Sequence, residues 1–256
     1  VVLITSHFEF GTCYSTALDW PRQSSIPTAV IAYDLIPLLF PERYLPKGSA
    51  IASWYQKKLE EFVRFDMFLA ISKSTQQDLI KHLGVSSEKI KVIGGGLDSR
   101  LAACASEGSL GDLGIQQPFV LVVSNGDWRK NALAALQTFA DLPGRLIESH
   151  QLVVTQIGDD FRKALETDYR QIADRVRILG KVSDETLTLL YSQCKVSFFP
   201  SFYEGFGLAV LESMAAGAPT LSSCLASLPE VVHDKQMLFD PRDRAASAAK
   251  IGRAHV

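Results

Sequence analysis

The chain has 256 residues, of which 47% are hydrophobic and 21% charged, values that place it among folded globular proteins and exclude intrinsic disorder. Its 26 lysines and arginines against 28 aspartates and glutamates give a net charge of −2, and no basic cluster indicates a nucleic-acid partner. The longest stretch without a charged residue, 213–229, contains a glycine and two prolines, so no membrane-spanning segment is predicted.

The cysteines and histidines form no motif for a metal or a disulfide. The four cysteines are widely spaced without a Cys-x-x-Cys pair, and the five histidines form neither His-x-His nor His-Glu-x-x-His. No two aspartates stand two positions apart. We therefore expect a reducing, cytoplasmic setting and a protein that needs neither a metal nor another cofactor.

We expect that neither end of the given sequence is a native terminus. The sequence starts within a predicted strand and its first methionine is Met67, so we expect an opening segment to be missing. Residues 250–256 resemble the in-frame translation of a common sequencing adapter. We interpret 250–256 as a non-native tail, which the sequence of the source DNA would test, and we exclude His255 from any site.

Short β-rich runs alternate with amphipathic segments in the first hundred residues. This alternation is typical of parallel strands joined by crossover helices. The pattern predicts strands over Val1–Thr5, Thr28–Tyr33, Met67–Ser72 and Lys89–Ile93, and helices over Ala50–Phe65 and Ser74–His82.

The alternation stops and then starts again. Residues 101–117 are rich in glycine and small polar residues without sustained periodicity, so they are predicted to be a linker, with a domain boundary near Pro118. The part beyond Pro118 reads as a doubly wound α/β domain in its own right. Its predicted strands are Phe119–Ser124, Leu152–Ile157, Val176–Leu179, Val196–Phe199 and Thr220–Ser222, and its predicted helices are Asn131–Asp141, Phe161–Asp174, Ser183–Gln193 and Gly207–Ala216.

Ligands of open α/β sheets bind outside the carboxyl ends of the strands, which directs attention to the turns there. The segment 200–212 joins a strand to a helix through Gly205 and Gly207, which allow an anion or a sugar to approach backbone N–H groups. Glu204 lies in this turn, whereas Glu212 lies further along the helix. The alternative is an ordinary tight turn followed by a solvated Glu212.

Two further turns contain candidate binding residues. Arg129 and Lys130 follow the strand Phe119–Ser124 and could clamp a diphosphate, although adjacent basic residues are more often solvated surface charges. The turn 179–184 could offer backbone groups to a ligand. Helix capping by Ser183 explains that turn equally well.

Together these segments resemble the retaining glycosyltransferases of family 4. The most specific match is the family's Glu-x7-Glu pattern at Glu204–Glu212, which follows the segment Phe199–Tyr203 in the run FPSFYEGFGL. Arg129–Asn131 looks like the family's phosphate-binding segment, and Tyr33–Leu38 is similar to a stretch of bacterial mannosyltransferase-like members. The resemblance covers most of residues 1–243.

The resemblance implies an α/β protein of the GT-B class, with two Rossmann-like doubly wound parallel-sheet domains that face a cleft, the first of them incomplete. Residues 1–100 would be part of the acceptor-side N-terminal domain, and 101–117 the linker. Residues 118–249 would form the C-terminal domain that binds the nucleotide sugar.

The resemblance also implies roles for single residues. Glu204 would contact the donor sugar near the reacting carbon, and Glu212 would hydrogen-bond the nucleotide ribose. Arg129 and Lys130 would neutralise the diphosphate leaving group, so that no divalent metal is required. The other predicted donor-binding residues lie in two turns, Gly205, Phe206, Gly207 and Leu208 in the first and Gly180, Lys181 and Val182, beside the base, in the second.

The roles of Tyr33, Asp34 and His7, which lie near the first predicted strands, stay open. Many family members have a histidine where Tyr33 stands, so the sugar contact passes to Tyr33 or Asp34, or the sugar preference differs. His7 follows the first predicted strand and is a candidate acceptor contact. A lone histidine at a strand end is more often structural, and this alternative stays open.

The apolar residues of Ala50–Phe65 recur at near-helical spacing with basic residues between them. We interpret this helix as one that covers a sheet, which is the commoner use of an amphipathic helix. The alternative follows from the resemblance, because family members often act on lipid-linked acceptors and such a helix could contact a membrane surface.

The function implied is that of a retaining, metal-independent hexosyltransferase. It would use GDP-mannose in preference to a UDP-sugar and act on a growing polysaccharide or a lipid-linked glycan, in the cytoplasm or at the inner face of the membrane. The alternatives are a GT-B enzyme with a UDP- or ADP-sugar donor and a degenerate protein that binds a nucleotide sugar without catalysis. Because Glu204 and Lys130 are both present, we favour catalysis; no feature indicates an oligomeric state.

Overall fold

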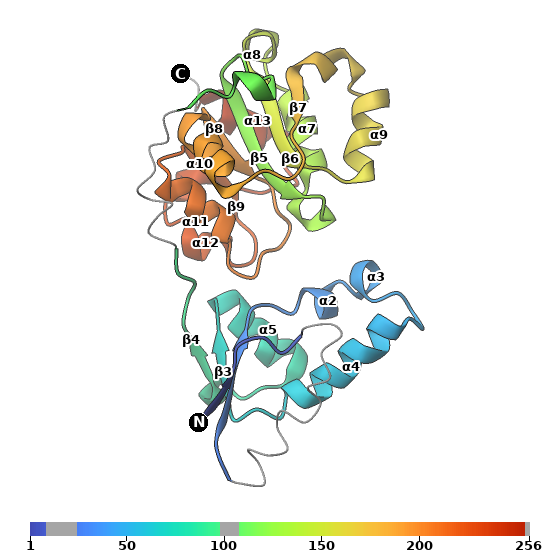
Figure 1. Cartoon of the computed structure of the whole chain (residues 1–256), viewed down its shortest axis with the longest axis vertical. Helices are drawn as coiled ribbons and strands as arrows, with labels where there is room; N and C mark the ends of the chain where they lie inside the picture. The colour runs from blue at the N-terminus through green and yellow to red at the C-terminus, as the bar shows by residue number, and fades with distance from the viewer. Residues whose placement is uncertain (9–24, 98–107, 254–256) are drawn as a thin grey trace. The chain divides into compact units, whose positions relative to one another are not determined.

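The computed structural model describes residues 1–8, 25–97 and 108–253 (Figure 1). The chain divides into two compact units, Val1–Gly95 and Gly96–Val256, each built on a parallel sheet. This is the α/β architecture that the alternating pattern predicts. The two units are described separately below.

The sheet of the first unit has its strands in the order of the sequence, β1-β2-β3-β4, and all its pairs are parallel. Each predicted strand is present but shorter by a residue or two at its ends, where turns begin. The strands are β1 (Val2–Ile4), β2 (Thr28–Ala32), β3 (Met67–Ala70) and β4 (Ile90–Val92).

The two longer helices of the first unit begin at serine caps. Ser49 accepts a hydrogen bond from the Ala52 N–H, and Ser72 accepts one from the Thr75 N–H, each satisfying a donor that the helix start leaves unpaired. The short 3-10 helix η2 (Ser87–Lys89) precedes β4. The α-helices within the described residues of this unit are α2 (Ile36–Leu39), α3 (Pro41–Tyr44), α4 (Ala50–Phe62) and α5 (Lys73–Leu83).

Helix α4 belongs to the core of the first unit. Its residues Tyr55, Leu59 and Phe62 are buried and pack with aromatic and aliphatic side chains of β2 and β3, whereas Ile51 is partly exposed. This confirms the interpretation of α4 as a helix that covers a sheet. None of the helices within the described ranges combines the length and apolar character needed to span a bilayer.

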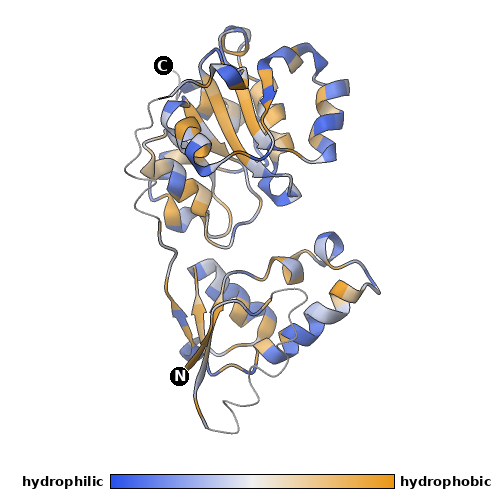
Figure 2. Cartoon of the chain, in the orientation of Figure 1, coloured by the Kyte–Doolittle hydropathy of each residue, from blue (hydrophilic) through white to orange (hydrophobic). Residues whose placement is uncertain are grey.

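The sheet of the second unit is doubly wound, and its described residues form six parallel strands in the order β10-β9-β8-β5-β6-β7. Its strands are among the most hydrophobic parts of the unit in Figure 2, as expected for strands covered on both faces. The sequence does not predict β10, which has only two residues. The strands are β5 (Phe119–Asn125), β6 (Gln151–Gln156), β7 (Val176–Ile178), β8 (Val196–Phe199), β9 (Thr220–Ser223) and β10 (Leu238–Phe239).

Three of the four predicted helices are present to within one residue at each end, and one is wrong. The sequence does not predict the helices Gly144–Ser149, Leu228–Val231 and Arg244–Arg253. The single helix predicted over Phe161–Asp174 is wrong, because the N–H groups of Asp168 and Tyr169 both donate to the Ala164 carbonyl and end α9. The chain continues as the 3-10 helix η5 (Arg170–Arg175), which buries Ile172. The α-helices are α7 (Ala132–Ala140), α8 (Gly144–Ser149), α9 (Asp159–Thr167), α10 (Asp184–Gln193), α11 (Leu208–Ala215), α12 (Leu228–Val231) and α13 (Arg244–Arg253).

The predicted linker and the predicted tail both contribute buried residues to the second unit. Within 108–117, the described part of the predicted linker, Leu110 and Ile115 are buried in the core, and Gln151 of β6 bonds the backbone beside them. Within the predicted tail, residues 250–253 continue α13 and bury Ile251. Residues 101–107 and 254–256 lie outside the described residues.

Gly207 at the start of α11 is expected to be essential for stability. Its φ is +103°, and a Cβ there would lie 2.8 Å from a methyl carbon of Leu228. Gly207→Ala should therefore lower the free energy of unfolding by more than the about 1–3 kcal/mol of a strained backbone alone, as measured by urea denaturation. Gly217→Ala is the matched control, because φ is +81° there and a Cβ would meet no atom. Equal losses in the two variants would contradict the steric argument.

Candidate active site

In the second unit, the chain leaves the neighbouring strands β5 and β8 in opposite directions across the sheet. From β5 the chain proceeds to β6 and β7 on one side, and from β8 it proceeds to β9 and β10 on the other. The neighbours β5 and β8 therefore lead into loops that part at the carboxyl edge of the sheet. In open α/β sheets this switch point is where ligands bind.

The loop after β5 is shaped by its own side chains. Asp127 accepts a hydrogen bond from the Arg129 N–H at 3.0 Å and starts the 3-10 helix η4 (Trp128–Lys130). Asn131 then adopts a left-handed conformation, with φ +54°, and begins α7. Asparagine tolerates this conformation better than most residues. The two turns fix the backbone of Arg129 and Lys130, whose side chains are each 15% exposed.

The loops after β5 and β8 are bonded to one another. The Phe202 N–H donates to the Arg129 carbonyl at 2.8 Å, and the Asn131 side-chain amide donates to the Pro200 carbonyl at 3.0 Å. The rings of Trp128 and Phe202 lie 5.9 Å apart. These contacts hold together two loops that are about 70 residues apart in the sequence.

Glu204 lies at the centre of these two bonded loops and is 7% exposed. Arg129 Nη1 lies 2.6 Å from one carboxylate oxygen, and Lys130 Nζ lies 2.7 Å from the other. Burial alone would raise the pKa of Glu204, but Lys130 and Arg129 together hold this pKa below its ordinary value. The three residues predicted as catalytic therefore form one ion-paired cluster.

Further bonds fix both ends of this cluster. Ser201 Oγ donates to Glu204 Oε1 at 2.9 Å, and Ser227 Oγ donates to the backbone carbonyl of Glu204 at 2.8 Å. Asp127 lies 3.3 Å from Arg129 Nε, and Arg129 Nη1 also donates to the Tyr203 carbonyl. Asp127, Ser201 and Ser227 have no predicted role. An Asx turn two residues before the arginine could have indicated Asp127.

Glu212 is a second carboxylate, on α11. It is half-buried, and its pKa is raised first by this burial and then by the negative charge of Asp184. The positive charge of Lys130 opposes both effects. Lys130 thus acts electrostatically on both glutamates of the predicted pair.

The turn between Glu204 and α11 leads into a helix start that has no side-chain cap. Gly205 is buried, and Gly207 begins α11 without a side-chain cap, so the first N–H groups of this helix have no partner within the helix. Phe206 is partly buried and Leu208 is 48% exposed. This is the arrangement in which a ligand oxygen can reach helix N–H groups.

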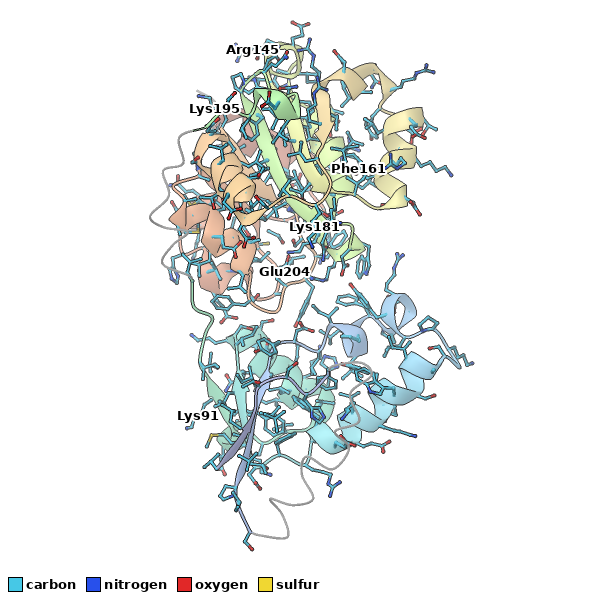
Figure 3. The ribbon with its side chains drawn as sticks, viewed as in Figure 1. Lys91, Arg145, Phe161, Lys181, Lys195 and Glu204 are labelled. Carbon is cyan, nitrogen blue, oxygen red and sulfur yellow. The ribbon has the colours of Figure 1, made fainter. Side chains whose placement is uncertain are left out.

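The turn after β7 lies at the same carboxyl edge, but β6 separates β7 from β5. Gly180 has a φ of +76°, Lys181 is exposed and Val182 is partly buried. Figure 3 shows Lys181 and Glu204 toward one end of the second unit, and Lys195 and Arg145 toward the other. Ser183 caps α10 through the Thr186 N–H, which confirms the capping prediction for this turn.

The three candidate residues of the first unit line one cavity of about 210 Å³. His7 is buried among Phe8, Phe62 and Phe65, and its ring hydrogen-bonds the Lys58 carbonyl at 2.9 Å. Burial lowers the pKa of His7, as is typical of a structural histidine.

Tyr33 and Asp34 follow β2 on the wall of the same cavity. Tyr33 is 49% exposed, and Asp34 accepts a hydrogen bond from the Ile36 N–H at the start of α2. Their predicted contacts with a sugar stay predictions. Over the described ranges of both units, no three His, Cys, Asp or Glu side chains are grouped as a metal site would require.

Comparison with known proteins places this geometry in a family. A family model described as glycosyl transferases group 1 matches residues 112–254, and a model described as Glycosyltransferase Family 4 matches residues 2–101. The chain is 32% identical over 255 residues to a serotype-specific mannosyltransferase WbdA of Escherichia coli, covering 95% of the chain and 31% of that protein. It is 36% identical over 141 residues to the O-antigen chain mannosyltransferase B of E. coli, covering 53% of the chain and 36% of that protein.

Solved structures show the same fold. Anabaena Alr3699/HepE has a TM-score of 0.74 at 20% identity, covering 99% of this chain and 68% of that one. The sucrose-phosphate synthase of Thermosynechococcus elongatus has a TM-score of 0.68 at 22% identity, covering 93% and 61%. This confirms the predicted GT-B class. The chain spans about a third of the length of the two curated relatives named above. Because the group 1 model covers more than half of the chain and the family 4 model matches most of the first unit, the chain belongs to the group 1 glycosyl transferases.

Proposed function

We propose that this chain carries the donor site of a retaining, metal-independent hexosyltransferase. The donor is a nucleotide-diphospho-sugar, with GDP-mannose favoured, and the acceptor is a growing polysaccharide or a lipid-linked glycan. The single observation that carries the proposal is the convergence of Arg129 and Lys130 on buried Glu204 at the switch point of the sheet.

Two cations at this point suit a diphosphate. A diphosphate offers several charged oxygens, whereas Glu204 offers two, so Arg129 and Lys130 can exchange the carboxylate for the ligand with a gain in charge-assisted hydrogen bonds. The same cations would then stabilise the negative charge that develops on the leaving diphosphate as the glycosidic bond breaks. The reaction would need no divalent ion for this purpose.

The remaining groups fit the rest of a donor. Glu204, once separated from its cations, would contact the sugar near the reacting carbon, and the N–H groups at Phe206 and Gly207 would hold sugar hydroxyls. Glu212 would accept a hydrogen bond from the ribose. The turn Gly180–Val182 would lie beside the base.

The choice of mannose rests on the relatives. The two E. coli relatives named above are mannosyltransferases by name, and one is an O-antigen chain enzyme. The Anabaena structures contain UDP, UDP and glucose, or UDP-glucose, at 19–20% identity to this chain. We therefore favour GDP-mannose and keep a UDP-sugar as the alternative donor.

A panel of nucleotides tests donor and metal dependence together. GDP and GDP-mannose should raise the melting temperature of the chain, because a ligand of the native state stabilises it, and EDTA should not reduce the shift. A larger shift with UDP or ADP conjugates would retain the site and replace the donor. The absence of a shift with all three nucleotides would contradict the donor site itself.

Lys130→Ala is expected to weaken GDP binding about ten- to hundredfold, because the diphosphate loses one charge-assisted hydrogen bond. Isothermal titration calorimetry measures the effect. Lys195→Ala is the control, because this exposed lysine lies toward the opposite end of the second unit (Figure 3). Equal affinities of the Lys130→Ala and Lys195→Ala variants would remove Lys130 from the clamp.

Glu204→Gln and Glu212→Gln should change GDP binding and sugar transfer in opposite ways. Glu204→Gln frees the two cations, so GDP affinity should hold or increase while sugar transfer falls by about a hundredfold. Glu212→Gln should weaken GDP binding more than it slows transfer. Calorimetry with GDP and transfer of radiolabelled mannose from GDP-mannose measure the two effects. A parallel loss of binding and transfer in Glu204→Gln would mean that its role is wrongly assigned.

A further inference from the structure

The proposed function leaves Glu204 in an unusual position. Both of its oxygens are paired with cations in the structure, and both cations are required by the diphosphate. Once the donor is bound, this buried carboxylate would lie beside an anion without the charges that now hold its pKa down. Burial and a neighbouring negative charge both favour protonation, and a protonated Glu204 would no longer be an anion beside the reacting carbon.

One partner of the carboxylate is not a cation. Ser201 Oγ donates to Glu204 Oε1 at 2.9 Å, and Ser201 is 1% exposed. A diphosphate competes for cations, but it does not displace a neutral hydroxyl that donates from within the protein. This hydrogen bond can therefore persist when the ion pairs are exchanged.

The backbone around Ser201 is fixed on both sides. The carbonyl of Pro200 accepts from the Asn131 amide, and the N–H of Phe202 donates to the Arg129 carbonyl. Glu204 itself is held at its backbone carbonyl by Ser227. Donor and acceptor of the Ser201–Glu204 bond are thus anchored independently of the Arg129 and Lys130 side chains.

We propose that Ser201 is a positioning residue that keeps Glu204 oriented and ionised when the donor diphosphate binds Arg129 and Lys130. The inference rests on the proposed function. The charged groups around Glu204 are Arg129 and Lys130, with Asp127 beside Arg129 and Glu212 acting on Lys130. In the exchange that we propose, Arg129 and Lys130 turn to the diphosphate, and the ionised Asp127 and Glu212 have no proton to donate.

The first experiment needs no ligand. Arg129→Gln with Lys130→Gln removes both cations, and the pKa of Glu204 is then followed by carbon-13 NMR of labelled glutamate carboxyls, assigned with Glu204→Gln. In this background Ser201→Ala should raise the pKa of Glu204 by about one to two pH units, because a hydrogen bond to the ionised form is lost.

Ser227→Ala is the matched control. It deletes an equally buried hydroxyl that also bonds Glu204, but at the backbone carbonyl rather than the carboxylate. It should lower stability without moving the pKa of Glu204. Equal pKa values in the Ser201→Ala and Ser227→Ala variants would overturn the inference.

The second experiment uses the natural cations and saturating GDP. GDP should raise the pKa of Glu204 in the unsubstituted chain, and raise it further in Ser201→Ala but not in Ser227→Ala. Ser201→Cys, which keeps the shape but donates more weakly, should give an intermediate value and replaces Ser201→Ala if that variant does not fold. A GDP-bound pKa unchanged by either Ser201 variant would overturn the inference.

The two experiments separate this inference from the proposed function. If no nucleotide in the panel binds, the proposed function fails, and the ligand-free experiment still decides the role of Ser201. If GDP binds and leaves the pKa of Glu204 unchanged, the exchange of cations is wrong although the donor site stands.

Discussion

The ion pairs of Glu204 are the interaction on which the candidate site depends. A buried carboxylate without a partner is costly, and here two cations and the hydroxyl of Ser201 satisfy it, while Ser227 bonds the backbone carbonyl of the same residue. The cations come from the loop after β5, and the carboxylate from the loop after β8. The cluster thus bonds together the two loops that the strand order separates, and it brings into one place the groups that a diphosphate and a sugar require.

The parallel sheet explains why these groups meet. The strands described for the second unit all run in one direction, so every loop that follows one of them emerges at the same edge. β5 and β8 are neighbours there, which brings Arg129 and Lys130 to Glu204. The loop after β7 reaches the same edge two strands from β5 and three strands from β8. A ligand that contacts both Glu204 and Gly180 must therefore be elongated, as a nucleotide-diphospho-sugar is.

The sequence predicted the parts of this site better than their contacts. Hydrophobic periodicity located the strands, and the turn residues located Glu204 and Arg129 at strand ends, because both signals are local. The β5–β8 pairing is not local, so the ion pairs could not be derived from spacing. Ser227 has no sequence signal, since it is 23 residues from the carbonyl that it bonds. The end of α9 is not predicted, because no glycine or proline marks it and the chain continues directly into a 3-10 helix.

The separation of Arg129 from Glu204 by 75 residues also bears on folding kinetics. Contacts between residues far apart in the chain form late, because the entropy of closing the intervening loop is lost before the contact forms. The β5–β8 pair must be in place before the carboxylate can reach its cations. The salt bridges therefore require the central β5–β8 pair of the sheet, and closing the chain between these two strands is an entropic cost that their formation must overcome.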